Sequence, residues 1–132
     1  MDERIHEHAE VLVNWSARVS EGDNVVVSVA EGAHDLAVAV AAELGDVGAN
    51  MTVQYGSSEV ERAYTKAHDG EFEESSHELA LYEETDVMLR LGGGRNTSAD
   101  ADVPPTKRQA AMQANQNVRE AVMDTDWVST VH

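Results

Sequence analysis

The most informative segment of the sequence runs from Trp15 to Tyr55, WSARVSEGDNVVVSVAEGAHDLAVAVAAELGDVGANMTVQY. Within it, Asn24–Ala30 is a nearly continuous run of β-branched residues, which is typical of a strand covered on both faces. Met51–Tyr55 repeats this pattern after two glycines. The connection Ala33–Leu44 has helical length and is apolar almost all round, so we expect it to lie against a sheet. The stretch therefore predicts a βαβ unit with parallel strands.

The alternation of helices and strands continues on both sides of this unit. An amphipathic helix is expected over Asp2–Val19, with Ile5, Leu12, Trp15 and Val19 along one apolar stripe. A polar helix is then expected, capped at Ser57-Ser58-Glu59 and stopping at Gly70, followed by a helix over Glu73–Glu84 and a strand over Val87–Leu91. The last two expected elements are a helix that starts at Pro104-Pro105 and a strand over Trp127–Val131. The residues expected to be buried in that helix are Ala111, Ala114, Val118, Ala121 and Val122. We predict a single three-layer α/β domain over residues 1–132, Rossmann-like, with a mainly parallel sheet of about four strands and helices on both faces.

Composition narrows the class of protein. The chain has 132 residues and no cysteine, so disulfides, thiolate metal sites and thiol nucleophiles are excluded. Its first residues, MDER, are polar and acidic where a secretory signal is basic and then apolar, and no run reaches the ~20 apolar residues of a membrane span. We therefore expect a cytoplasmic protein.

The charge balance is strongly acidic. Twenty-five Asp and Glu against nine Lys and Arg give a formal net charge of −16, which repels phosphate backbones and anionic lipid headgroups. Nucleic acid and membranes are therefore not expected partners. Dispersed carboxylates, few lysines and many small side chains favour solubility in concentrated salt, where a Debye length of about 3 Å screens self-repulsion. We interpret the composition as halophilic.

Most candidate chemical groups have a simpler structural explanation. His6 and His8 are two residues apart on a helix and point about 200° apart, so they are poorly placed to share a metal. His68 and His77, near three glutamates, lack a recognised ligand spacing and are interpreted as part of a solvated acidic connection. Ser57 and Ser58 lack a nucleophile elbow and are better explained as helix caps.

The best candidate for ligand binding follows the third expected strand. Gly92, Gly93 and Gly94 allow backbone amides to approach a ligand, and Arg95 suits a carboxylate or phosphate, although no nucleotide-binding fingerprint is present. A flexible turn is the alternative. Arg90, a charge inside an apolar strand, indicates either an edge strand or an interface with something outside this chain.

The order of these segments resembles one known family. The matching segments are Ala9–Val13, Val19–Val27, the Ala-rich helix, Leu44–Val53 and Asp102–Lys107. Together they resemble the amino-terminal domain of the aminopeptidase T and aminopeptidase S family of metal-dependent aminopeptidases, the thermophilic-type metalloproteases. The resemblance covers essentially all 132 residues, and Gly92–Ala101 departs from the family's pattern.

The resemblance implies a parent enzyme that releases amino-terminal residues from peptides, uses two divalent metal ions such as cobalt, zinc or magnesium, and is a homodimer. It places the metal ligands in a carboxy-terminal catalytic domain that is absent from this chain, so no catalytic or metal-binding position is assigned here. The alternative that we keep open is a stand-alone acidic α/β domain that binds a small ligand or a partner without catalysis.

Overall fold

The computed structural model describes residues 2–92 and 103–129 of the chain. Its elements, in chain order, are α1 (Glu3–Glu10), the π-helical η1 (Val11–Ser16), β1 (Asn24–Val29), α2 (His34–Val47), β2 (Asn50–Tyr55), α3 (Ser58–Ala67), α4 (Ser76–Glu83), β3 (Val87–Leu91), α5 (Pro105–Ala114), α6 (Gln116–Met123) and β4 (Asp126–Ser129). No helix of the described residues is long and apolar enough to cross a membrane.

The four strands form one parallel sheet in the order β2-β1-β3-β4. The central strand β1 aligns Val26 with Thr52 of β2 on one side and with Met88 of β3 on the other. The predicted βαβ unit and the mainly parallel sheet are therefore confirmed.

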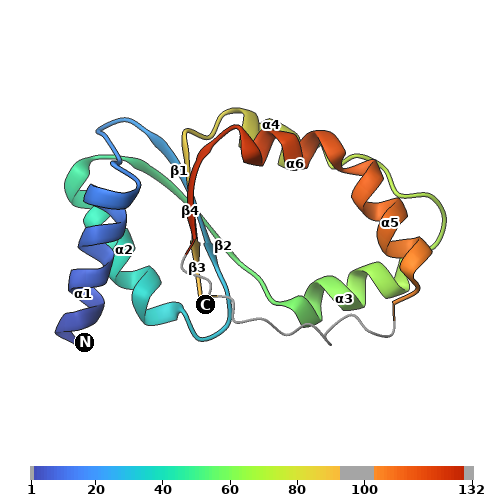
Figure 1. Ribbon diagram of the computed structural model, residues 1–132, viewed down its shortest axis with the longest axis horizontal. Coiled ribbons are helices and arrows are strands. Elements are labelled where there is room, and N and C mark those ends of the chain that lie inside the picture. Colours follow the sequence, from blue (N-terminus) through green and yellow to red (C-terminus); the bar gives the residue numbers. More distant parts are fainter. Residues whose placement is uncertain (1, 93–102, 130–132) are drawn as a thin grey trace.

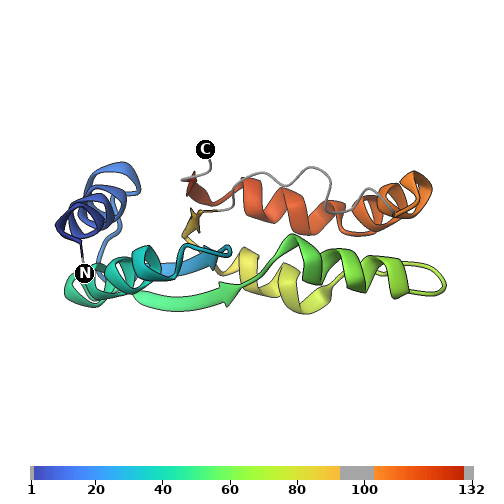
Figure 2. The same cartoon turned by 90° about the horizontal axis from the view of Figure 1, so that it is seen from below.

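Helices cover both faces of this sheet, as predicted (Figures 1 and 2). Because successive strand residues point to opposite faces, Val25, Val27 and Val29 pack in the cluster that includes residues of α1, η1 and α2. Val26 and Met88 point the other way and pack with Tyr82 of α4 and with two valines of α6. The result is the expected three-layer α/β arrangement.

Helices α3 and α5 lie away from the sheet, at the far end of the molecule from α1 (Figure 1). Neither helix has a fully buried residue. Lys107 Nζ of α5 donates to the carbonyl of Lys66 in α3 at 2.8 Å. These two helices therefore add little to the core and extend the surface on one side of it.

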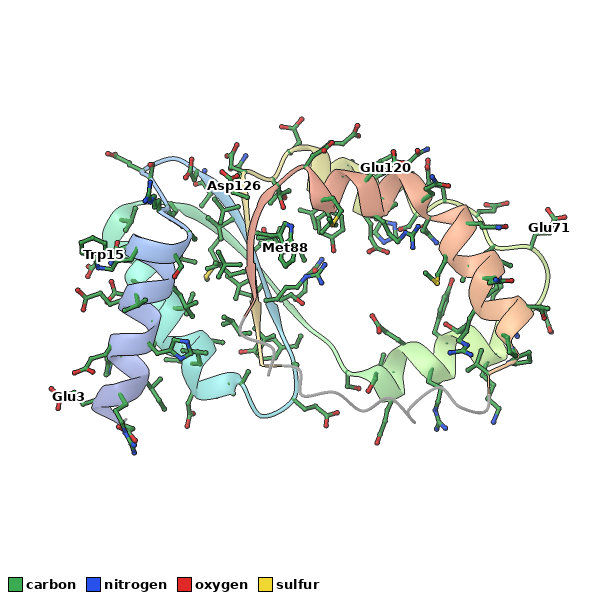
Figure 3. The ribbon with its side chains drawn as sticks, viewed as in Figure 1. Glu3, Trp15, Glu71, Met88, Glu120 and Asp126 are labelled. Atoms are coloured by element: carbon green, nitrogen blue, oxygen red, sulfur yellow. The ribbon has the colours of Figure 1, made fainter. Side chains whose placement is uncertain are left out.

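The first helix is shorter than predicted. Its α-helical part ends at Glu10, and a π-helical turn carries the chain only to Ser16, followed by Arg18 with φ of 52°. A π-turn changes the angle between successive side chains, and the predicted stripe holds for Ile5, Leu12 and Val19, which pack in the core, but not for Trp15. Leu12 is buried as predicted, but Trp15 is 72% exposed and projects away from the sheet (Figure 3).

The last predicted helix is two helices, because Asn115 interrupts it. The Asn115 side chain accepts from the backbone N–H of Ser75 at 2.9 Å and donates to the carbonyl of Ala111 at 3.1 Å. Val118 and Val122 are buried as predicted, whereas Ala111 and Ala114 are only half-buried.

Other boundaries also differ from prediction. The polar helix ends at Ala67 and the next one starts at Ser76. The last strand begins at Asp126 and is described to Ser129, so the predicted residues 130 and 131 lie outside the described residues.

Candidate functional site

An open hollow of about 930 Å³ lies at the carboxyl ends of β1, β2 and β3. The sheet order changes direction here, because β1 is followed by β2 on one side while β3 lies on the other. In open α/β sheets this position is where ligands usually bind. The polar side chains that line the hollow include Ser28, Gln54, Glu61, Glu78, Tyr82 and Arg90.

Tyr82 of α4 is the most buried polar side chain in this group, at 7% exposed. Its hydroxyl donates to Oε1 of Gln54 at 3.2 Å. Burial raises the pKa of Tyr82, and the neighbouring Glu78 carboxylate raises it further, against the opposite effects of the Gln54 hydrogen bond and the Arg90 charge. Tyr82 is therefore a neutral hydrogen-bonding group at physiological pH.

Arg90 lies in β3, with its side chain exposed in the hollow. Its guanidinium carbon lies 5.7 Å from the centroid of the Trp127 ring, a cation–π distance. The explanation of Arg90 as an edge-strand residue is wrong, because β3 lies between β1 and β4. Its role at an interface with something outside this chain stays a prediction.

Gly92 lines the same hollow at the carboxyl end of β3. Its φ is +73°, and a Cβ placed on it would lie 2.7 Å from Cβ of Ala33, just before α2. A positive φ and close packing against Ala33 therefore both favour glycine at this position. Gly93, Gly94 and Arg95 lie outside the described residues, so the ligand role of Gly92 to Arg95 stays a prediction.

Ser57 caps a helix, as the sequence indicated. Its Oγ accepts from the backbone N–H of Val60 at 3.2 Å, and Ser58 is the first residue of α3. This interaction satisfies one of the unpaired amides at the helix start.

The histidines make local contacts. The ring of His68 stacks on Phe72 at 4.2 Å between centroids, and its Nε2 donates to the carbonyl of Glu71 at 3.1 Å. His77 Nδ1 lies 3.4 Å from the hydroxyl of Ser75, while His6 and His8 are exposed on α1. Across residues 2–92 and 103–129, no three His, Asp or Glu side chains are placed to hold a metal ion.

Two contacts near the strand ends were not predicted. One is the Tyr82–Gln54 hydrogen bond, and the other joins His34 Nδ1 to the Tyr55 hydroxyl at 3.2 Å. Gln54 and Tyr55 end β2, so strand alternation places them on opposite faces. The helix residues that contact Gln54 and Tyr55 are set by the tertiary arrangement, and no local sequence pattern specifies that arrangement.

Comparison with known proteins places the chain in a family. A sequence comparison with curated proteins finds no match. The family model described as thermophilic metalloprotease (M29) matches residues 1–130. Among solved structures, wild-type AmpT from Thermus thermophilus is similar, with a TM-score of 0.75 and 20% sequence identity over 96% of this chain and 35% of that chain.

The structural similarity shows a shared fold, and the chain spans about a third of the AmpT chain that it matches. The family model matches residues 1–130 of the 132. The chain therefore belongs to the thermophilic metalloprotease (M29) family.

Proposed function

We propose that residues 1–132 form the amino-terminal, non-catalytic domain of a metal-dependent aminopeptidase, which hydrolyses amino-terminal residues from peptides. The observation that carries the proposal is the M29 match over residues 1–130, in a chain that spans only 35% of AmpT. The remaining part of the parent protein would then hold the catalytic domain.

The proposed metal ions are two divalent cations, cobalt, zinc or magnesium, in that catalytic domain. When bound, such a pair activates a water and polarises the scissile carbonyl. The described residues of this chain do not fit such a site, because they bring no three suitable ligands together. We therefore assign no catalytic step to these residues.

The contribution of this domain to the enzyme would be to shape the substrate cleft. The hollow at the strand ends supports this proposal, because it is open and lined by polar groups on an apolar floor. Glu31, Glu59, Glu61 and Glu78 outnumber Arg90 as charged groups in it. Their combined field favours a cationic group, such as the protonated amino terminus of a peptide, over an anionic one.

The remaining proposals concern the setting in which the enzyme works. We propose a homodimeric parent protein in the cytoplasm of a halophile, with peptides as substrates. The net charge of −16 and the absence of cysteine support the setting, and the family resemblance supports the dimer.

The competing proposal is a stand-alone domain that binds a small ligand near Gly92 to Arg95. The observation in its favour is that Gly92 and Arg90 line the same hollow. The two proposals make different predictions for the isolated chain. A stand-alone domain would bind its ligand by itself and would not be part of a peptidase.

The test is a peptidase assay on the purified 132-residue chain with leucine p-nitroanilide in the presence of Co²⁺, Zn²⁺ or Mg²⁺. Far-ultraviolet circular dichroism on the same sample establishes that the chain is folded. We expect no metal-dependent release of p-nitroaniline from the folded chain. Release that EDTA abolishes would refute the non-catalytic assignment.

A further inference from the structure

The strand β2 forms an edge of the sheet that is unusually poor in charge. In the order β2-β1-β3-β4, it pairs with β1 on one side, and among the described residues no strand pairs with its other side. It lies within the longest stretch of the sequence without an Asp, Glu, Lys or Arg, which runs for 12 residues from Val47 to Ser58. Edge strands are usually protected by charges or proline, and β2 has neither.

The outer side of β2 offers backbone hydrogen-bonding groups. The N–H of Asn50 donates to Asp23 and that of Gly56 donates to Val29, so the even-numbered residues face β1. In a parallel ladder the alternate residues bond in the opposite direction. The N–H and C=O groups of Met51, Val53 and Tyr55 therefore point to the open side.

The side chains of these three residues share one face and remain unusually exposed. Met51 is 43%, Val53 38% and Tyr55 61% exposed. Val38 of α2 is 45% exposed and lies one helical turn from His34, which contacts Tyr55. We call Val38, Met51, Val53 and Tyr55 the β2 edge patch, which is apolar and carries no formal charge.

We propose that a second copy of this chain occupies the β2 edge, with the two β2 strands antiparallel about a twofold axis at Val53. Val53 then faces Val53 of the second copy, and Met51 faces Tyr55 of the second copy. Both copies present outward-pointing backbone groups at these positions, so the hydrogen bonds match in register. The sheet becomes a continuous one of twice the width.

Charge selects a second copy as the occupant. Two chains of net charge −16 repel each other over most of their surfaces. The twofold arrangement places the stretch from Val47 to Ser58, which has no charged residue, against itself. In this arrangement, the contact between the two β2 strands includes no pair of like charges. The same contact buries the β2 edge patch.

The inference rests on the dimer in the proposed function and is independent of the metal chemistry. It is tested by sedimentation equilibrium of the 132-residue chain in molar KCl. The variants V53D and V53K each bring like charges together at the axis. We expect each variant to raise the dissociation constant of the dimer at least about tenfold. An equimolar mixture of the two variants pairs opposite charges and should restore the dimer.

The matched control is V60D, which makes the same change on α3 at a side chain that is 66% exposed. We expect V60D to remain dimeric. A monomeric wild-type chain would overturn this interface and leave the proposed dimer of the parent protein to contacts outside residues 1–132. A dimer that persists in both V53D and V53K would overturn this interface and leave a dimer through another surface.

A cross-linking experiment tests the register. The chain has no cysteine, so V53C introduces a single thiol. Opposed residues of a hydrogen-bonded antiparallel pair have Cα atoms about 5.5 Å apart, which is within disulfide range. Mild oxidation should therefore cross-link V53C much faster than V60C. Equal rates in the two variants would contradict the proposed register.

Discussion

Replacing Gly92 with alanine tests the packing at the mouth of the hollow. The backbone at Gly92 has φ of +73°, and an L-residue there costs about 1–2 kcal/mol. The added Cβ would also meet Cβ of Ala33 at 2.7 Å, an overpacking that typically costs about 1–3 kcal/mol. We therefore expect Gly92→Ala to lower the free energy of unfolding by about 2–5 kcal/mol. This is a large part of the total for a typical domain, which is about 5–15 kcal/mol.

Two other glycines separate the cost of the positive φ from the cost of the close Cβ contact. Gly22 has φ of +83° with nothing within 4 Å of an added Cβ, so Gly22→Ala should cost only the backbone term of about 1–2 kcal/mol. Gly45 lies in α2 with no positive φ and open space around it. Gly45→Ala should therefore stabilise the chain by about 1 kcal/mol, because alanine is the better helix former.

The assay is urea unfolding followed by circular dichroism at one fixed KCl concentration, with the slope of each transition compared between variants. The order of stability should be Gly45→Ala, wild type, Gly22→Ala and then Gly92→Ala. If Gly92→Ala were no less stable than Gly22→Ala, the close approach of Gly92 and Ala33 would be refuted.

Three further predictions concern ionisation, packing and salt. Because burial raises the pKa of Tyr82, the folded chain holds this proton more tightly than the unfolded chain, so this stabilisation is present below about pH 10 and is lost at higher pH. Urea unfolding of Tyr82→Phe should show a shallower loss of stability in alkali, and an unchanged slope would contradict the assignment. Leu89→Ala should cost about 2–5 kcal/mol, since Leu89 is fully buried in β3, and the same assay should give a much smaller loss for Val60→Ala, at a side chain that is 66% exposed. The midpoint temperature of thermal unfolding should rise between low and molar KCl. A midpoint that does not rise would contradict the halophilic interpretation.

The central strands were predictable because burial decides them. The run Val25–Val29 is almost entirely apolar, and the structure places it between helices on both faces. The strand Met51–Tyr55 was expected to repeat that pattern, but it is mostly exposed at the sheet edge. Its alternation of apolar and polar residues fits an exposed edge strand, yet sequence alone does not specify strand order.

The misplaced elements depend on tertiary contacts. Asn115 breaks the last helix through a hydrogen bond to Ser75, 40 residues earlier in the chain. The contact between Tyr82 and Gln54 likewise joins segments 28 residues apart. Of the predicted site Gly92 to Arg95, the described residues include Gly92, which lines the hollow at the carboxyl end of β3, and the ligand role of this segment stays a prediction. The neighbouring polar groups come from other elements, so they could not be grouped from local spacing.

The proposed function of this chain is that of a non-catalytic domain of a metal-dependent aminopeptidase. Its most direct test is to express the native reading frame that contains these 132 residues and to compare its product with the 132-residue chain in the same leucine p-nitroanilide assay with added divalent metal. We expect EDTA-sensitive hydrolysis by the native product and none by the folded 132-residue chain. Hydrolysis by the 132-residue chain, or a native product inactive with cobalt, zinc and magnesium, would contradict it.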